Sequence, residues 1–212
     1  MRILLINPKS KLPIDTRTSP PLGLAYLAAV SEQQGHTVRV YDGDIEPTPL
    51  AKVAEDFAPE VVGLTANTTQ ITAAWRDAAL IKSTTGAHTV LGGPHPTTLP
   101  EESATKPFVD VVVRSEGEAT WLDLLAAWQH SGATQDSVLA LADAAAGASR
   151  PGAGGPITGI TFQDPEGDIV NTPPRAPIPR AELDSLPFPA WHLFQLDRYT
   201  NLQPTVDQRE GP

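Results

Sequence analysis

The chain has 212 residues, and its hydrophobic share of 40% is enough to build one sizeable core. Its formal net charge of -10, without any Lys/Arg-rich stripe, argues against a nucleic-acid partner. Because the sequence contains no cysteine, it excludes disulfides, thiolate catalysis, zinc–thiolate sites and iron–sulfur clusters within this chain.

The sequence also lacks the signals of a membrane or secreted protein. No apolar run approaches the roughly 20 residues that are needed to cross a bilayer. The opening segment Met1–Pro8 has the pattern of a short buried strand and is too short for a signal peptide. We therefore expect a cytoplasmic protein with no membrane partner.

Residues 1–130 alternate short β-branched runs with helical stretches, which is typical of βαβ units and a parallel sheet covered on both faces. The pattern predicts an α/β fold with a flavodoxin-like, doubly wound sheet of five parallel strands. The expected strands are Arg2–Asn7, Thr37–Tyr41, Val61–Thr65, Thr89–Leu91 and Val109–Arg114. The expected helices are Pro21–Gln34, Leu50–Phe57, Thr69–Ser83, Thr97–Thr105 and Glu118–His130.

Two features of the helical pattern carry further expectations. Gly35 follows the first helix and suits the left-handed conformation that ends many helices. Trp121 and Trp128 lie at helical spacing in the last helix, which predicts that both pack in the core rather than against a cofactor.

The second part of the chain has a different composition. We expect an α/β domain at 1–135, a flexible Ala/Gly-rich linker at 136–156, and a β-hairpin with an extended arm at 157–212. The hairpin is predicted from Ile157–Phe162 and Asp168–Asn171, which flank the turn sequence Asp164–Gly167.

Candidate binding residues follow strands one, three, four and five, because ligands of open α/β sheets bind at the carboxyl ends of the strands. The first loop is much longer than a usual βα connection. The candidates are Asn7, Pro8, Pro21, Leu22 and Gly23; Thr65, Ala66, Asn67 and Thr68; Gly92, Gly93, Pro94, His95 and Thr97; and Ser115, Glu116, Gly117 and Glu118.

Structural explanations compete at some of these positions. The consecutive glycines Gly92 and Gly93 remove every Cβ and would let a ligand approach the backbone, although a tight turn alone explains one of them. Capping explains part of the role of Thr68, and a favourable helix dipole is sufficient for Glu118. His95 has no second histidine at metal-ligand spacing, so we expect hydrogen bonding or packing and no metal site. Phosphate-binding glycine motifs are absent.

These residues together resemble the N-terminal cobalamin-binding domains of B12-dependent radical-SAM enzymes, which have a Rossmann-like B12-binding fold. The resemblance extends through the hairpin and arm and covers most of the chain except the linker. The matching segments are Leu4–Pro8, Pro20–Ala29, Pro59–Thr65, Leu91–Thr97, Val112–Glu118, Asn171–Arg175 and Leu183–Tyr199.

The resemblance implies that cobalamin binds base-off, with its benzimidazole detached from cobalt and its nucleotide tail entering the sheet. Thr65 and the pair Gly92 and Gly93 correspond by position to residues that line the tail channel in such modules. No histidine here belongs to a D-x-H-x-x-G motif, so histidine ligation of cobalt is not expected. Residues within Asn7–Gly23 would approach the lower face instead. The cofactor form, methylcobalamin, adenosylcobalamin or hydroxocobalamin, stays open.

The resemblance also implies a catalytic partner, because the radical-SAM domain holds its cluster with C-x-x-x-C-x-x-C and this chain has no cysteine. We expect a non-catalytic module that acts as a methyl carrier or electron-transfer partner, with a radical-SAM domain in cis or in trans. A truncated chain and a stand-alone protein both remain open. Three alternatives also remain: a stand-alone B12 carrier or light-responsive regulator, a flavodoxin-like FMN protein, and a structural domain that has lost its ligand.

Overall fold

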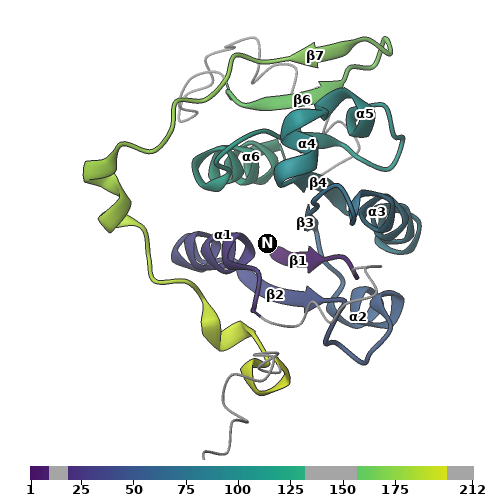
Figure 1. The fold of residues 1–212 in the computed structure, drawn as a ribbon. Coiled ribbons are helices and arrows are strands. Elements are labelled where there is room, and N and C mark those ends of the chain that lie inside the picture. The colour runs from purple at the N-terminus through teal and green to yellow at the C-terminus, as the bar shows by residue number, and fades with distance from the viewer. Residues whose placement is uncertain (10–18, 132–156, 200–212) are drawn as a thin grey trace, which may run out of the picture.

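The computed structural model describes residues 1–9, 19–131 and 157–199, which form one twisted sheet with helices on both faces and an arm along one side (Figure 1). The strands are β1 Arg2–Asn7, β2 Thr37–Asp42, β3 Val61–Thr65, β4 His88–Gly92, β5 Val111–Val113, β6 Ile160–Gln163 and β7 Ile169–Asn171. The α-helices are α1 Leu22–Gln33, α2 Leu50–Phe57, α3 Ile71–Thr85, α4 Pro94–Thr98, α5 Pro100–Ala104 and α6 Glu118–Ser131. Short 3-10 helices occupy η1 Arg180–Ser185, η2 Trp191–Leu193 and η3 Leu196–Arg198.

The sheet has the strand order β2-β1-β3-β4-β5-β6-β7. Strands β1 to β5 are parallel, as predicted, and the order reverses beside β1, which pairs with both β2 and β3. This reversal defines the switch point at which doubly wound sheets bind ligands.

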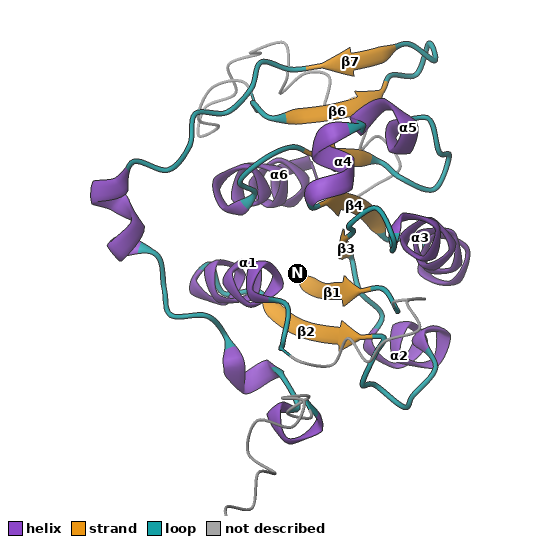
Figure 2. Ribbon diagram, in the orientation of Figure 1, coloured by secondary structure: helices purple, strands orange, loops and turns teal. Residues whose placement is uncertain are grey.

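The expectation of a five-stranded sheet is wrong, because the described sheet has seven strands. The hairpin β6–β7 does form, but it pairs antiparallel with β5, where Val112 lies opposite Thr161 and Val113 opposite Ile160. An unpaired β5 would expose a row of backbone donors and acceptors at the sheet edge, and the hairpin satisfies them. Figure 2 shows β6 and β7 beyond β4, at the opposite end of the sheet from β2.

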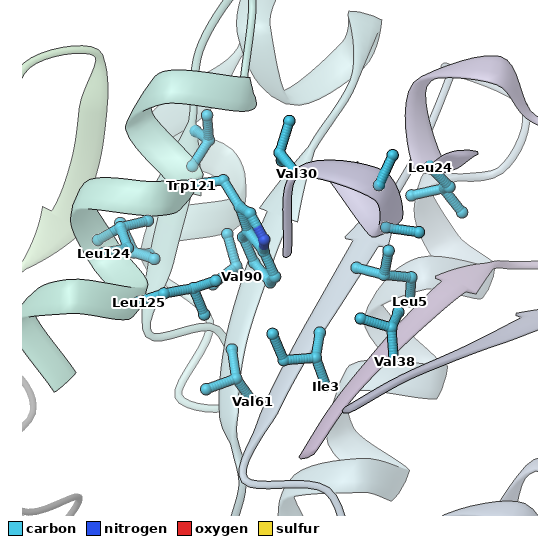
Figure 3. Packing of buried hydrophobic residues seen from close by; sticks show 14 of the residues in the cluster. Ile3, Leu5, Leu24, Val30, Val38, Val61, Val90, Trp121, Leu124 and Leu125 are labelled. Atoms are coloured by element: carbon cyan, nitrogen blue, oxygen red, sulfur yellow. The ribbon is translucent and has the colours of Figure 1, made fainter. Parts of the chain in front are cut away.

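Two hydrophobic clusters lie on opposite faces of the sheet, because side chains alternate along each strand. Ile3 and Leu5 of β1 point toward α1 and α6, whereas Leu4 and Ile6 point toward α2 and α3. Figure 3 shows the first cluster, where Trp121 reaches from α6 toward the strands. The prediction that Trp121 and Trp128 belong to the core is confirmed, since both are fully buried.

The helices match the predicted ranges to within two residues at each end, except for the fourth. Gly35 has a φ of +77°, as expected for a residue just beyond the end of α1. The predicted fourth helix, Thr97–Thr105, is instead two short helices, α4 and α5. Pro100 explains the break, because proline has no N–H to continue α4 but is well suited to the first turn of α5.

The arm is less extended than predicted, since it contains the turns η1, η2 and η3. It runs from β7 along the outer side of α6 and α1 (Figure 1), and the N–H of Ala190 donates to the carbonyl of Ala25 on α1 at 3.0 Å. The predicted linker 136–156 and the end of the arm beyond Tyr199 lie outside the described residues. Among the described helices, none has the length and apolar content that would let it cross a bilayer.

Candidate functional site

A pocket of about 190 Å³ lies where α1 and α6 meet the carboxyl ends of the strands. Glycines and apolar side chains make up most of its lining, with four polar residues at its wall. The glycines are Gly23, Gly63, Gly92, Gly93 and Gly117; the apolar residues are Leu24, Leu27, Leu64, Val90, Val113 and Trp121; the polar residues are Thr65, Ser115, Glu116 and Glu118.

The two consecutive glycines of the pocket have different structural requirements. Gly93 has a φ of +101°, and a Cβ built on it would lie 2.7 Å from Thr65 Oγ1 and 2.9 Å from the backbone nitrogen of Ala66. The backbone turn therefore requires glycine at position 93. Gly92 has no positive φ, and a Cβ there would meet only Val113 at an ordinary 3.7 Å. The fold itself does not require a glycine at position 92, where a side chain would instead occupy the pocket.

Trp121 forms the inner wall of the pocket. A Cβ on Gly63 of β3 would lie 3.1 Å from the indole ring, so the bare strand at this position gives the ring room to lie against the sheet. The indole Nε1–H donates to Ser31 Oγ at 2.8 Å, and Ser31 in turn donates to the carbonyl of Leu27. This chain of hydrogen bonds satisfies the buried indole and fixes its orientation.

The loop between β5 and α6 leads to two carboxylates with different surroundings, since Glu116 bonds the arm and Glu118 lies at the start of α6. Ser115 has a φ of +65°, and its N–H donates to Thr97 Oγ1 at 3.0 Å. Glu116 Oε2 accepts a hydrogen bond of 2.7 Å from the N–H of Ile178 in the arm. Glu118 belongs to the first turn of α6 and lines the pocket, and its Oε2 is buried with no hydrogen-bond partner among the described residues.

Asn7 and Pro8 lie in a separate polar cluster at the ends of β1 and β2 rather than in the pocket lining. Asn7 Nδ2 donates to Asp42 Oδ1 at 3.0 Å, and Gln70 Nε2 donates to Asn7 Oδ1 and to the carbonyl of Pro8. Tyr199 donates its hydroxyl to Asp42 Oδ2 at 2.8 Å. Burial raises the pKa of Asp42, although its hydrogen-bond donors lower it in part.

The side chains after β3 and β4 are engaged mainly with one another. Asn67 Oδ1 accepts hydrogen bonds from the N–H groups of Thr69 and Gln70, a local turn that precedes α3. His95 is buried, with Nδ1 at 3.3 Å from Thr68 Oγ1 and Nε2 at 3.0 Å from Glu102 Oε2. In the described parts of the chain, no group of three or more His, Asp or Glu side chains is placed to hold a metal ion.

The structure therefore brings together part of the predicted set. The predicted residues that line the pocket are Gly23, Thr65, Gly92, Gly93, Ser115, Glu116, Gly117 and Glu118. Those that do not line it are Asn7, Pro8, Pro21, Leu22, Ala66, Asn67, Thr68, Pro94, His95 and Thr97.

The candidates from the sequence do not include seven of the pocket residues, all of which lie within strands or helices. These are Leu24, Leu27, Gly63, Leu64, Val90, Val113 and Trp121. Alternation along each strand could have identified those that share the α1 and α6 face. Trp121 was assigned to the core, and it contributes to both the core and the pocket.

A doubly wound α/β sheet with an open, glycine-lined pocket at its switch point defines a cofactor-binding domain of the flavodoxin-like class. Comparison with known families gives the closer assignment: the B12 binding domain family matches residues 16–125. The chain belongs to the B12-binding domain family. This match, together with the relatives and solved structures described next, confirms the resemblance to the cobalamin-binding domains of B12-dependent radical-SAM enzymes.

Curated relatives include an uncharacterized methyltransferase of Pyrococcus horikoshii, 33% identical over 207 residues, which cover 94% of this chain and 40% of the relative. The cytidylyl-2-hydroxyethylphosphonate methyltransferase of Streptomyces wedmorensis is 28% identical, with coverages of 99% and 44%. The anaerobic magnesium-protoporphyrin IX monomethyl ester cyclase of Rubrivivax gelatinosus is 30% identical, with coverages of 94% and 34%. This chain spans less than half the length of each of these relatives.

Solved structures share the fold. The cobalamin-dependent S-adenosylmethionine radical enzyme OxsB, with aqua-cobalamin and S-adenosylmethionine bound, has a TM-score of 0.67 at 18% identity and matches 93% of this chain and 25% of its own. The radical S-adenosylmethionine methyltransferase TsrM from Kitasatospora setae, with cobalamin and a 4Fe-4S cluster bound, has a TM-score of 0.58 at 22% identity, with coverages of 84% and 30%.

Proposed function

We propose that this chain binds cobalamin base-off, with the nucleotide tail inserted into the pocket between α1 and α6 and the corrin ring across the strand ends. The observation that carries the proposal is the side-chain-free backbone at Gly92. A methyl group on Gly92 would make only ordinary van der Waals contacts with the protein, so the packing of the fold does not require glycine here. The missing side chain leaves room in the pocket for a ligand.

The composition of the pocket fits the chemistry of such a tail. Dimethylbenzimidazole is a flat aromatic ring whose faces are apolar, although one ring nitrogen is free when it is detached from cobalt, and the indole of Trp121 together with Leu24 and Val90 offers apolar surface for those faces. Thr65, at the end of β3, places a hydroxyl at the wall for the polar atoms of the tail. The predicted contacts at Gly23, Ser115 and Glu116 lie around the same pocket and belong to the proposal.

The FMN alternative fits less well. Of the described residues that line the pocket, none is Lys or Arg, and two are glutamates, Glu116 and Glu118. A flavin mononucleotide carries a phosphate monoester with nearly two negative charges, whereas the phosphodiester of a cobalamin tail carries one, so such a wall would repel FMN more strongly. Nothing in the described geometry favours flavin over a corrinoid.

Cobalamin would supply a methyl-carrying or electron-transferring cobalt centre, and the protein's own residues would bind and orient it. We propose that the chemistry takes place with a radical-SAM domain or protein, in cis or in trans. This proposal is supported by the relatives whose names are methyltransferase or cyclase, each of which is longer than this chain.

Gel filtration tests the proposal. The purified chain is mixed with a small excess of hydroxocobalamin, passed over the column, and scanned across the visible range. We expect a red chromophore to elute with the protein at close to one equivalent, with a spectrum of displaced benzimidazole. A colourless protein peak would contradict the proposal.

A further inference from the structure

The two helices beside the pocket, α1 and α6, are connected to each other by the arm. Near the start of α6, the N–H of Ile178 in the arm donates to Glu116 Oε2 at 2.7 Å. On α1, the carbonyl of Ala25 accepts a hydrogen bond of 3.0 Å from the N–H of Ala190. The arm therefore bridges α6 and α1 on the side away from the sheet, as Figure 1 shows.

The segment between these two attachment points, Pro179–Pro189, is here termed the strap. All of its hydrogen bonds to described residues stay within the arm, and Phe188 is almost fully exposed. Leu186 alone of its side chains packs in part against the core. Three of its residues are prolines, at positions 179, 187 and 189, and each fixes its own φ. The strap is therefore a stiff connection that lies loosely on the protein.

Both attachment points of the strap adjoin the pocket. Glu116 itself lines the pocket, and Leu24, the neighbour of Ala25, lines it from the other side. They lie where α6 and α1 begin, at the carboxyl ends of the strands. The strap therefore restrains the distance between the two helices at the level where the pocket opens.

The hydrogen bond between Trp121 and Ser31 also joins α6 to α1, but at a different level. Ser31 lies one turn beyond Leu27, which is the last residue of α1 in the pocket lining. This bond closes the inner side of the pocket and leaves the strap as the connection near its opening.

The size of the pocket gives this restraint a consequence. Its volume is about 190 Å³, whereas pockets that hold small molecules and cofactors measure roughly 300–1,000 Å³. A nucleotide tail comprises a bicyclic base, a ribose and a phosphodiester, so the pocket has to widen to hold it. Because α1 and α6 are regular helices, widening requires that their first turns move apart, and the strap opposes that movement.

We propose that the strap limits cofactor entry: it holds α1 and α6 together in the ligand-free protein, so corrinoid binding and strap attachment oppose each other. This inference rests on the proposed function and adds a means of regulating it. Coupling between two equilibria is reciprocal. A looser strap therefore raises corrinoid affinity, and a bound corrinoid loosens the strap.

Softening the strap tests the first half of this coupling. The double variant Pro179→Gly/Pro187→Gly frees two backbone positions and removes no hydrogen bond from the body of the protein. We expect it to bind hydroxocobalamin about 5-fold or more tightly than wild type, with faster association in stopped-flow absorbance. Pro165→Gly in the exposed hairpin turn is the matched control and should leave both values unchanged.

Limited proteolysis of the wild-type chain tests the second half. Arg180 is an exposed trypsin site within the strap, and Lys52 on α2 is an exposed site distant from it in the fold. We expect saturating hydroxocobalamin to raise the cleavage rate after Arg180 by about 2-fold or more relative to the rate after Lys52. Mass spectrometry distinguishes the two cleavages. Circular dichroism checks that the double variant is folded, and the proteolysis carries the test if it is not.

The outcomes separate this inference from the proposed function. If the wild type binds hydroxocobalamin but the folded double variant has the same affinity, or the corrinoid leaves cleavage after Arg180 unchanged or slower, the strap restraint is overturned and the proposed function stands. Binding by the double variant alone would support both. If neither protein retains the corrinoid, the proposed function fails, and the role of the strap fails with it.

Discussion

The hydroxyl of Tyr199 donates a hydrogen bond of 2.8 Å to Oδ2 of Asp42, and this bond joins the arm to the carboxyl end of β2 across 157 positions of sequence. Asp42 is 5% exposed, and its other carboxylate oxygen accepts hydrogen bonds from Asn7 Nδ2 and from the N–H of Asp44. The arm is therefore attached at the carboxyl-terminal ends of the strands, where the proposed corrinoid site also lies.

Tyr199→Phe should destabilise the protein in a pH-dependent way. Burial raises the pKa of Asp42, and the Tyr199 hydroxyl lowers it in part by bonding the ionised form. Between the ordinary pKa and the raised one, the folded state binds more protons than the unfolded state, so the free energy of unfolding falls as pH rises. Without the Tyr199 hydroxyl, the pKa of Asp42 rises further and the free energy of unfolding falls more steeply with pH. We expect Tyr199→Phe to lower the free energy of unfolding, relative to wild type, by about 1.5–3 kcal/mol at about pH 8 and by less at about pH 4.5.

Urea unfolding at the two pH values measures this effect. Tyr26→Phe on α1 is the control, because the Tyr26 hydroxyl makes no hydrogen bond within the described residues. Its effect on the free energy of unfolding should be the same at both pH values. Equal losses for Tyr199→Phe at both pH values would show that the ionisation of Asp42 is not coupled to the arm.

Gly92 and Gly93 should respond differently to substitution. Gly92→Leu places a side chain in the pocket at a position where Cβ meets only ordinary contacts, so we expect near wild-type stability and loss of hydroxocobalamin from the gel-filtration peak. Gly93→Ala combines a positive φ with a Cβ only 2.7 Å from Thr65 Oγ1, so it should lower the free energy of unfolding by about 1–3 kcal/mol. Retained binding in a folded Gly92→Leu protein would remove position 92 from the site.

The hydrogen bond between Trp121 and Ser31 should contribute to the stability of the pocket wall. Ser31→Ala leaves the buried indole N–H without its acceptor, which we expect to cost about 1–3 kcal/mol. Trp121→Phe removes the donor, so adding Ser31→Ala to it should cost less than Ser31→Ala alone. A double-mutant cycle measured by urea unfolding gives the coupling, and strictly additive losses would contradict a direct bond.

Glu116 should hold the arm against the loop that precedes α6. Glu116→Ala removes the acceptor of the Ile178 N–H, so the segment around the exposed Arg180 should open more often. We expect trypsin to cleave after Arg180 about 2- to 5-fold faster, as followed by mass spectrometry. Glu166→Ala should leave the rate unchanged, and an unchanged rate in Glu116→Ala would mean that this bond does not restrain the arm.

Much of the fold was predictable because its signals are local. Alternating strand and helix patterns located all five parallel strands, and β1 and β3 have the predicted bounds. The pairing of β6 with β5 was not predictable from these patterns, because Val113 and Ile160 are far apart in the sequence and no local signal identifies partners. The break between α4 and α5 did have a local signal in Pro100.

The candidate site was predictable only in part, for a related reason. The rule that ligands bind at the carboxyl ends of strands located Thr65, Gly92 and Gly117, which line the pocket. The same rule included His95 and Asn67, which the structure shows bonded to neighbouring side chains or backbone groups. Whether a loop side chain faces a pocket or a neighbour depends on tertiary contacts, and the sequence does not contain those directly.

The account requires that benzimidazole leaves cobalt so that the tail can enter between α1 and α6, and electron paramagnetic resonance of cob(II)alamin bound to the protein tests that detachment most directly. A tail held in the pocket separates benzimidazole nitrogen from cobalt, so we expect a spectrum without the nitrogen splitting that this ligand imposes on free cob(II)alamin. Retention of that splitting in protein-bound cob(II)alamin would contradict the proposed site.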